Sequence, residues 1–244
     1  MTIHRAMILA AGKGTRLAPL THTRPKPLME VAGRPMLVHL LEFLRAGGID
    51  EVVMNLHHLG HLIEAAIGDG AAFGVRVRYS HEDPILDTGG GIAHARALLG
   101  DEPFVVANGD SLLELPLREL TAFHRARGGI ATMAVRPAPD AASWGLIELD
   151  QDDRVRRVVG RPDGPVSAPL RGFMFPGLHV FEPAVFARMD PGGSFSVIRE
   201  TYPRLLRSGE AVYGFVTEAR WVTIDTAEGL AAAGDTLSRA PFRF

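Results

Sequence analysis

MILAAGKGTRLAPLTHTRPKPL, residues Met7 to Leu28, is the stretch that decides the fold of this chain. The apolar run Met7–Ala10 predicts a short buried strand, which leads into the glycine-rich segment Gly12–Arg16. Arg24 and Lys26 follow, and Lys26 is flanked by two prolines. A strand that ends in a glycine-rich, cationic turn predicts a phosphate site. Small residues let backbone N–H groups approach an anion, and the cations neutralise its charge.

Two common phosphate-binding motifs do not fit this turn. The P-loop has the form G-x-x-x-x-G-K-[ST], whereas Lys13 lies between the two glycines here. The dinucleotide fingerprint G-x-G-x-x-G would need a third glycine where this chain has Leu17. The turn therefore indicates a different class of phosphate-binding protein.

The composition is that of a globular protein. The chain has 244 residues, 46% hydrophobic and 22% charged, which is enough to bury the core of one domain. A net charge of −2 provides no basic field, so we expect neither a nucleic-acid partner nor a membrane surface. The chain has no cysteine, which excludes disulfides and thiolate metal sites and suits the cytoplasm, where we expect the protein to work.

Strands and helices alternate over residues 1–135. We predict strands at Ala6–Ala10, Glu51–Leu56, Val75–Tyr79, Phe104–Ala107 and Ile130–Val135. We predict helices at Met36–Ala46, Leu59–Ile67, Gly90–Leu99 and Leu117–Arg127. This alternation predicts an α/β fold in which helices cover both faces of a parallel sheet, with ligands bound beyond the carboxyl ends of the strands.

Residues 136–237 have a different pattern. Trp144–Leu149 and Arg154–Val159 predict a β-hairpin, and the proline- and glycine-rich segment Gly160–Gly172 predicts a mobile loop. Further strands are predicted at Gly177–Phe181, Val212–Val216 and Trp221–Ile224, and helices at Pro183–Arg188, Ile198–Ser208 and Ala227–Leu237. We interpret the chain as a single domain, residues 1–244. Its first half binds nucleotide, residues 136–237 complete the sheet and add a small substrate-binding lobe, and residues 238–244 form an irregular tail.

The opening stretch resembles the first motif of the sugar-1-phosphate nucleotidyltransferases, or NDP-sugar pyrophosphorylases, which is roughly G-x-G-T-R-L, then P-L-T, then P-K-P. The three parts stand here as Gly12–Leu17, Pro19–Thr21 and Pro25–Pro27. The resemblance implies a Rossmann-like three-layer α/β/α sandwich with a mostly parallel mixed sheet and a small sugar-binding lobe. It also implies a Mg²⁺-dependent reaction, in which an NTP and a sugar 1-phosphate give an NDP-sugar and pyrophosphate.

The resemblance assigns the nucleotide site. Arg16 and Lys26 match the catalytic cations of the family. The nucleotide-binding residues it implies are Ala10, Ala11, Gly12, Gly14, Thr15, Arg16, Lys26, Glu82, Thr88, Gly89 and Gly90. The run Thr88–Gly91 is most similar to the N-acetylmuramate-1-phosphate uridylyltransferases, which favours UTP. GTP with mannose 1-phosphate or a heptose 1-phosphate is the alternative.

The resemblance also assigns the metal and sugar sites. Asp110, just past a buried strand, matches the first metal-binding Asp. The second belongs to a W-x-D-x-G-T strand, where this chain has Thr223 at the Asp position and Asp225 at the Gly position. In an extended strand this shift is roughly 7 Å at about 3.4 Å per residue. Asp225 could still reach the metal through a local shift, Asp110 could hold the metal alone, or activity could be lost; we favour the first two.

The sugar-phosphate site is implied at Asn108, Gly145, Arg161 and Gly177. Arg161 stands where the family has the Lys of E-K-P, and Gly160 replaces its Glu, which leaves the sugar open. One rival is another nucleotidyltransferase of the same fold, acting on a phosphorylated alcohol or a pterin cofactor. Another is a non-catalytic nucleotide-sugar-binding regulator, which Thr223 suggests. We expect a monomer or a homodimer.

Overall fold

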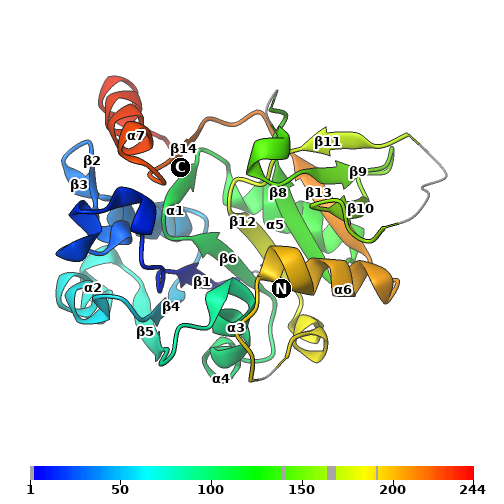
Figure 1. The fold of residues 1–244 in the computed structure, drawn as a ribbon, viewed down its shortest axis with the longest axis horizontal. Coiled ribbons are helices and arrows are strands. Elements are labelled where there is room, and N and C mark those ends of the chain that lie inside the picture. Colours follow the sequence, from blue (N-terminus) through cyan, green and yellow to red (C-terminus); the bar gives the residue numbers. More distant parts are fainter. Residues whose placement is uncertain (1–2, 139–140, 164–168, 191) are drawn as a thin grey trace.

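A seven-stranded mixed sheet forms the centre of the computed structural model, which describes residues 3–138, 141–163, 169–190 and 192–244 (Figure 1). Its strand order is β13-β8-β12-β6-β1-β4-β5. The strands are β1 Arg5–Leu9, β4 Glu51–Leu56, β5 Arg76–His81, β6 Phe104–Asn108, β8 Ala131–Val135, β12 Leu178–Phe181 and β13 Val212–Val216. Only β12 is antiparallel to its neighbours in this sheet. The predicted mostly parallel α/β sheet is thus confirmed.

Helices cover both faces of the sheet. They are α1 Met36–Ala46, α2 Gly60–Ile67, α3 Asp87–His94, α4 Arg96–Leu99, α5 Leu117–Arg127, α6 Tyr202–Arg207 and α7 Ala227–Arg239. Side chains of β1 alternate between two cores: Ala6 and Ile8 pack with α1, α2, α5 and α7, whereas Met7 packs with α3, α4 and α6. A strand buried on both faces explains why the sequence of β1 is continuously apolar.

A three-stranded antiparallel sheet, order β10-β9-β11, lies beside the edge strand β13. It consists of β9 Ile147–Leu149, β10 Val155–Val158 and β11 Arg171–Phe173. The hairpin predicted here forms, but its first strand starts three residues late, because Ala141–Trp144 form a 3-10 turn. The predicted mobile loop ends in β11, and its residues 164–168 lie outside the described part of the chain.

Two short strand pairs complete the fold: β7 Ser111–Leu113 with β14 Trp221–Thr223, and β2 Glu30–Val31 with β3 Arg34–Pro35. The remaining short helical turns are Thr15–Leu17, Leu20–His22, Lys26–Leu28, Ala71–Phe73 and Pro183–Arg188. The helix predicted at Ile198–Ser208 begins instead as a π-helical turn, Val197–Thr201, which runs into α6. The register of β14 places Thr223 opposite Ser111, next to Asp110.

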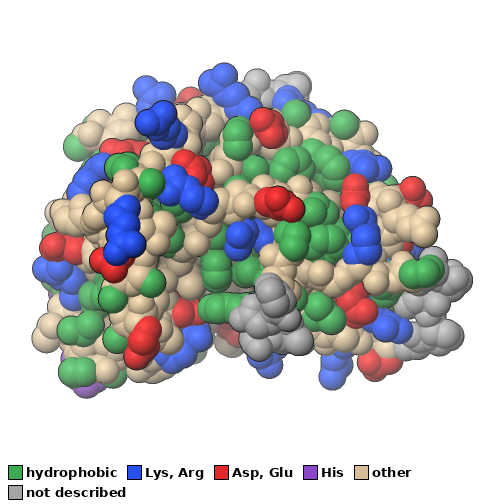
Figure 2. Space-filling view, turned by 90° about the horizontal axis from the view of Figure 1, so that it is seen from above, with side chains coloured by type: hydrophobic (Ala, Val, Ile, Leu, Met, Phe, Trp, Pro, Cys, Tyr) green, Lys and Arg blue, Asp and Glu red, His purple; other side chains and the backbone are tan. Residues whose placement is uncertain are grey.

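The C-terminal tail packs against the domain. Helix α7 extends to Arg239, so the irregular tail is shorter than predicted. The ring of Phe244 lies 5.2 Å from that of Phe43 on α1, edge to face, and the backbone N–H of Arg243 donates to Glu114 at 2.9 Å. Among the described helices, none has the length and apolar character needed to cross a bilayer. Viewed from above, acidic and basic side chains are interspersed on the surface (Figure 2).

Candidate active site

The glycine-rich loop follows β1 at the carboxyl edge of the sheet and folds back over Lys26. Gly14 has a φ of +61°, and a Cβ at this position would lie 2.8 Å from the Thr21 side chain and 3.2 Å from that of Lys26. The Thr21 hydroxyl donates to the Gly14 carbonyl at 3.0 Å. A Cβ on Gly12, in contrast, would meet nothing within 4 Å. Gly14 is therefore needed for the fold, whereas Gly12 leaves open space beside the loop.

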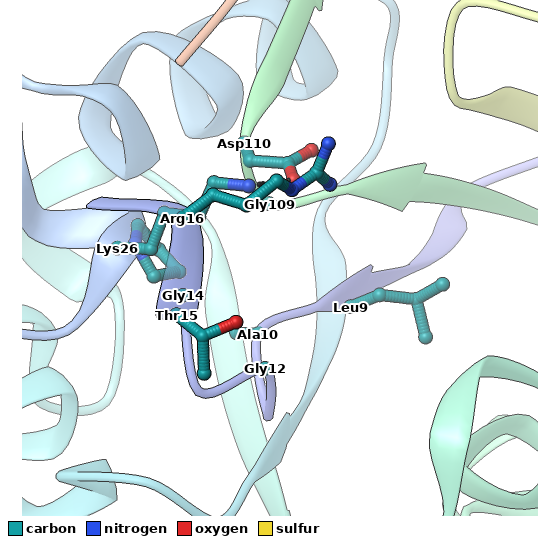
Figure 3. A pocket seen from close by; sticks show the side chains of 10 residues that line it. Leu9, Ala10, Gly12, Gly14, Thr15, Arg16, Lys26, Gly109 and Asp110 are labelled. Atoms are coloured by element: carbon teal, nitrogen blue, oxygen red, sulfur yellow. Dashed lines mark hydrogen bonds and ion pairs between the residues drawn. The ribbon is translucent and has the colours of Figure 1, made fainter. Parts of the chain in front are cut away.

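Four charged side chains meet in front of this loop, and we call them the ionic cluster: Arg16, Lys26, Asp110 and Asp225. The Lys26 ammonium donates to Asp110 at 2.6 Å and also to Asp225. Arg16 pairs with the other oxygen of Asp225 at 3.1 Å. Figure 3 shows the Arg16 side chain reaching across toward Asp110 above the loop. Three distant parts of the sequence thus bring two cations and two carboxylates together.

The backbone explains how Asp225 reaches the cluster. Strand β14 ends at Thr223, so extended-strand spacing does not apply to the residues after it. The N–H of Ile224 donates to the Asp110 carbonyl at 2.9 Å, and the Thr223 hydroxyl donates to the same carbonyl at 3.2 Å. The chain then turns, and Asp225 meets the ammonium that binds Asp110. Thr223, at the expected Asp position, therefore anchors the backbone of Asp110.

The two carboxylates have opposite pKa shifts. Burial raises the pKa of Asp110, and the negative charge of Asp225 adds to this, although Lys26 opposes both. Burial also acts to raise the pKa of Asp225, but Lys26 and Arg16 outweigh it and leave that pKa below its usual range. Together the pair provides hard oxygen ligands, the kind that Mg²⁺ prefers. No group of three or more metal-ligating side chains occurs among the residues that the structure describes.

Two adjoining cavities open beside the ionic cluster. The smaller, about 220 Å³, is lined by Leu9, Ala10, Gly12, Gly14, Thr15, Arg16, Lys26, Pro27, Gly109 and Asp110. The larger, about 470 Å³, is lined by Leu9, Ala11, Gly12, Asn55, Glu82, Ile85, Asp87, Thr88, Asn108, Asp110 and Ser194. They share Leu9, Gly12 and Asp110. All the residues predicted to bind nucleotide line one of these cavities, except Gly89 and Gly90.

Gly89 and Gly90 instead pack against a distant segment. A Cβ on Gly89 would lie 2.4 Å from the ring of Phe195, and one on Gly90 would lie 2.4 Å from the carbonyl oxygen of Gly193. Both backbone N–H groups donate to the Phe195 carbonyl, at 2.8 and 3.2 Å. The close packing of α3 on this segment accounts for both glycines, and their contact with nucleotide stays a prediction.

Glu82 belongs to a buried hydrogen-bond network that includes a residue the sequence interpretation missed. The N–H of Ala10 donates to the Asn55 side-chain oxygen at 2.8 Å, and the Asn55 amide donates to Glu82 at 2.7 Å. The N–H of Leu86 donates to the other Glu82 oxygen at 2.8 Å. The signal for Asn55 was a polar residue near the carboxyl end of the valine-rich strand β4. This network holds the loop, β4 and α3 in register.

A third cavity, about 280 Å³, also borders the ionic cluster. It is lined by Arg16, Asp87, Thr88, Asn108, Asp110, Ser111, Trp144, Phe175, Pro176, Ser196, Val197, Ile198, Trp221, Thr223 and Asp225. The rings of Trp144 and Trp221 meet edge to face at 5.2 Å, and Trp221 donates to the Pro176 carbonyl at 3.1 Å. The sequence interpretation places Gly145 at the sugar site and gives no role to the side chains of Trp144 and Trp221.

The predicted sugar-phosphate residues are not all brought together. Asn108 lines the third cavity. Gly177 packs against Asn108, since a Cβ on Gly177 would come within 2.9 Å of the Asn108 side chain. Gly145 follows Trp144 with a φ of +90° and does not line the cavity. Arg161 closes the turn at the end of β10 and is likewise absent from the wall that the described residues form.

Comparison with known proteins identifies relatives along most of the chain. The sequence profile described as "Nucleotidyl transferase" matches residues 5–239. The chain is 35% identical over 235 residues to the mannose-1-phosphate guanylyltransferase of Mycobacterium tuberculosis, covering 96% of this chain and 64% of that protein. It is 34% identical over 233 residues to the UTP–glucose-1-phosphate uridylyltransferase of Synechocystis, covering 90% and 60%. The chain thus spans less than two thirds of the length of these curated relatives.

A solved structure shares the fold. HddC from Yersinia pseudotuberculosis, crystallised with GMP-PN, superposes with a TM-score of 0.79 over 96% of this chain and all of that one. The two sequences are 23% identical, so this likeness supports the arrangement of the elements.

Proposed function

Because the chain belongs to the nucleotidyl transferase family, we propose that it is an enzyme that joins a nucleoside triphosphate to a sugar 1-phosphate. The observation that carries this proposal is the ionic cluster, whose residues line both the cavity beside the loop and the third cavity. The reaction brings two polyanions together, and it therefore needs cations between them. Arg16 and Lys26 stand at that junction, on a loop whose backbone is open to a phosphate chain.

The geometry suggests how the chain would perform the reaction. An oxygen of the sugar phosphate forms a bond to the α-phosphorus, the bond from that phosphorus to the bridging oxygen breaks, and pyrophosphate leaves with the electron pair. The protein contributes position and charge, not a nucleophile. We assign Arg16 to the triphosphate, where it would offset the negative charge that develops on transfer. Lys26 lies between the carboxylates and the loop, from where it would contact the α-phosphate and the sugar phosphate.

Asp110 and Asp225 are the residues that would hold Mg²⁺. They fit this ion because their carboxylates share one ammonium partner and can provide hard oxygen ligands on one side of a cleft. With two protein ligands, the remaining positions would be filled by phosphate oxygens and water. When bound, the metal would neutralise phosphate charge and fix the phosphate geometry. The closeness of Asp225 to Asp110 supports catalysis over a purely regulatory binding role.

The larger cavity beside the loop favours some bases over others. Glu82 and Asp87 place carboxylates in its wall, and ionised carboxylates only accept hydrogen bonds. Uracil and guanine carry a ring N–H that would donate to these oxygens. Cytosine and adenine could donate only from their exocyclic amino group, and their bare ring nitrogen, an acceptor, would lie beside the carboxylates. We keep UTP as the first candidate and GTP as the second. The relatives include enzymes named for each base.

We assign the sugar 1-phosphate to the third cavity, between Asn108 and the Trp144–Trp221 pair. Gly145, Arg161 and Gly177 stay in this proposal as residues near that site. We further propose that the chain works in the cytoplasm as one domain with two lobes, as a monomer or a homodimer.

A pyrophosphate-release screen tests the proposal. UTP, GTP, CTP and ATP are each combined with glucose, mannose, heptose and N-acetylmuramate 1-phosphates in the presence of Mg²⁺. We expect turnover with UTP or GTP and at least one sugar phosphate. Asp110→Asn and Asp225→Asn should each lower it by about 100-fold or more in a protein that is still folded by circular dichroism. No turnover with any pair, from a protein that is folded, would refute the proposal.

A further inference from the structure

The two halves of the chain meet in a compact contact beside the substrate cavities, which we call the clasp. It joins residues 86–90, at the start of α3, to residues 193–197, at the start of the π-helical turn. The Phe195 N–H donates to the Leu86 carbonyl at 3.1 Å, and the Phe195 carbonyl accepts from the glycines of α3. The Val197 N–H donates to the Thr88 hydroxyl oxygen at 2.9 Å. Among these hydrogen bonds between the two segments, the one to Thr88 involves a side chain and the others join backbone groups.

The clasp is tightly fitted. Phe195 is buried at 5% exposure, and its ring fills the space where a Cβ on Gly89 would lie. Asp87, just before Thr88, has a φ of +58°, a conformation that non-glycine residues adopt at an energetic cost. Its carboxylate accepts from the Thr88 N–H at 2.5 Å. A strained residue next to a binding cavity is a common sign of a functional constraint.

The clasp lies between the nucleotide and sugar cavities. Thr88 lines both of them. In the other segment of the clasp, residues 193–197, Ser194 lines the larger cavity, whereas Ser196 and Val197 line the third cavity. A ligand in either cavity would therefore contact the segment that forms the wall of the other.

We propose that the clasp couples the two substrate sites and that Thr88 is the positioning residue through which it does so. This inference rests on the proposed function. A nucleotide that orders the start of α3 fixes the Thr88 hydroxyl, which fixes the Val197 N–H and the wall of the sugar cavity. The second substrate then meets a wall that is already ordered and binds more tightly. Linkage requires the sugar phosphate to strengthen nucleotide binding by the same factor.

Calorimetry measures this coupling without turnover. The probes are the α,β-methylene analogues of UTP and GTP, which cannot transfer the nucleotidyl group, with glucose 1-phosphate or mannose 1-phosphate. The coupling factor is the Kd of the analogue alone divided by its Kd with saturating sugar phosphate. We expect a factor of about 5 or more in the wild type. Thr88→Val should bring it close to 1, and Thr88→Ser, which keeps the hydroxyl, should restore it.

A second variant removes the donor of the same hydrogen bond. Val197→Pro deletes the backbone N–H at the first position of a helical turn, where proline is well tolerated, and Ser196 before it is already extended. We expect it to abolish coupling, whereas Val197→Ala, which keeps the N–H, should not. Combining Val197→Pro with Thr88→Val should have no further effect on the coupling factor, because both remove one bond.

Thr201→Val is the matched control. Thr201 lies on the same π-helical turn, and its buried hydroxyl makes no hydrogen bond among the described residues. We expect it to keep the wild-type coupling factor. A coupling factor of 1 in the wild-type protein would overturn the inference and leave the proposed function standing. So would a coupling factor in both Thr88→Val and Val197→Pro that equals that of the wild type. If no analogue and no sugar phosphate binds the folded protein, the inference and the proposed function are both refuted.

Discussion

Replacing Lys26 by methionine removes the ammonium between Asp110 and Asp225 and keeps a side chain of similar length. Lys26 is largely buried, with only 11% of its side chain exposed. Without it, the two carboxylates face each other, and Arg16 is the cation that stays beside them among the described residues, paired with Asp225. The variant should therefore be less stable at neutral pH, and it should bind a divalent cation more readily than the wild type.

The size of the effect follows from the geometry. At 2.6 Å and an effective dielectric constant of about 20, one ammonium–carboxylate attraction is about 6 kcal/mol before desolvation is subtracted. Removing one partner of a buried pair has a net cost of about 3–5 kcal/mol. Arg16 and partial solvent access at this cleft place the expected loss at the lower end, about 3 kcal/mol. For a chain of this length that corresponds to a fall in Tm of about 6–12 °C.

Thermal unfolding in a Mn²⁺ titration measures both parts. Mn²⁺ at about 100 times its Kd contributes about 2.7 kcal/mol to the folded state, so it should recover most of the loss in Lys26→Met. The wild type should respond much less, because the ion must displace the ammonium. Arg24→Met is the control, since Arg24 is half exposed and pairs with an exposed Glu30, and its stability should change by less than about 1 kcal/mol. A Lys26→Met protein as stable as the wild type, with no response to Mn²⁺, would refute this reasoning.

Four further substitutions test the loop, the clasp and the sheet. Gly12→Ala should leave Tm unchanged but weaken binding of the triphosphate in calorimetry, because its Cβ would occupy the open space beside the loop. Gly89→Ala should lower stability by about 1–3 kcal/mol through overpacking against Phe195. Asn55→Leu should lower stability by about 1–3 kcal/mol in denaturant titration, since it removes the partner of the buried Ala10 N–H and of one Glu82 oxygen. The hydrogen bond from Arg5 holds the pKa of Glu51 below its usual range, so Glu51→Gln should cost about 1–2 kcal/mol at pH 7, and the difference from the wild type should vanish as the pH falls below about 4 and through that depressed pKa.

The elements that the sequence predicted are those with a strong local pattern. The helices Met36–Ala46 and Leu117–Arg127 have the predicted bounds because their apolar residues repeat with the helical period. The strand Glu51–Leu56 has the predicted bounds because it is a short, nearly continuous apolar run. Strands β7 and β11, each three residues long, were missed. Their pairing depends on partners far along the chain, which no local pattern reports.

In the site, too, features that are local in sequence were predicted and contacts between distant segments were not. The loop from Gly12 to Lys26 was evident because its motif is continuous in sequence. The role of Phe195 was not, because its contact with α3 joins segments about a hundred residues apart. Gly89 and Gly90 are predicted to contact nucleotide, yet both are needed to admit the ring and backbone of this distant segment. A glycine run reports close approach but does not name what approaches.

The position of Asp225 shows that the chemistry of this site constrains charge in space more tightly than it constrains the sequence. Arg16 and Lys26 give two positive charges, and Asp110 alone would leave the cluster with an excess positive charge and a buried ammonium with one carboxylate partner. Asp225 brings the four groups to neutrality, although it stands two residues after the position at which the family pattern has its acid. That shift is possible because β14 ends at Thr223, whose hydroxyl still fixes the Asp110 backbone. Thr223 and Asp225 therefore divide between them two tasks, anchoring one carboxylate and providing the other.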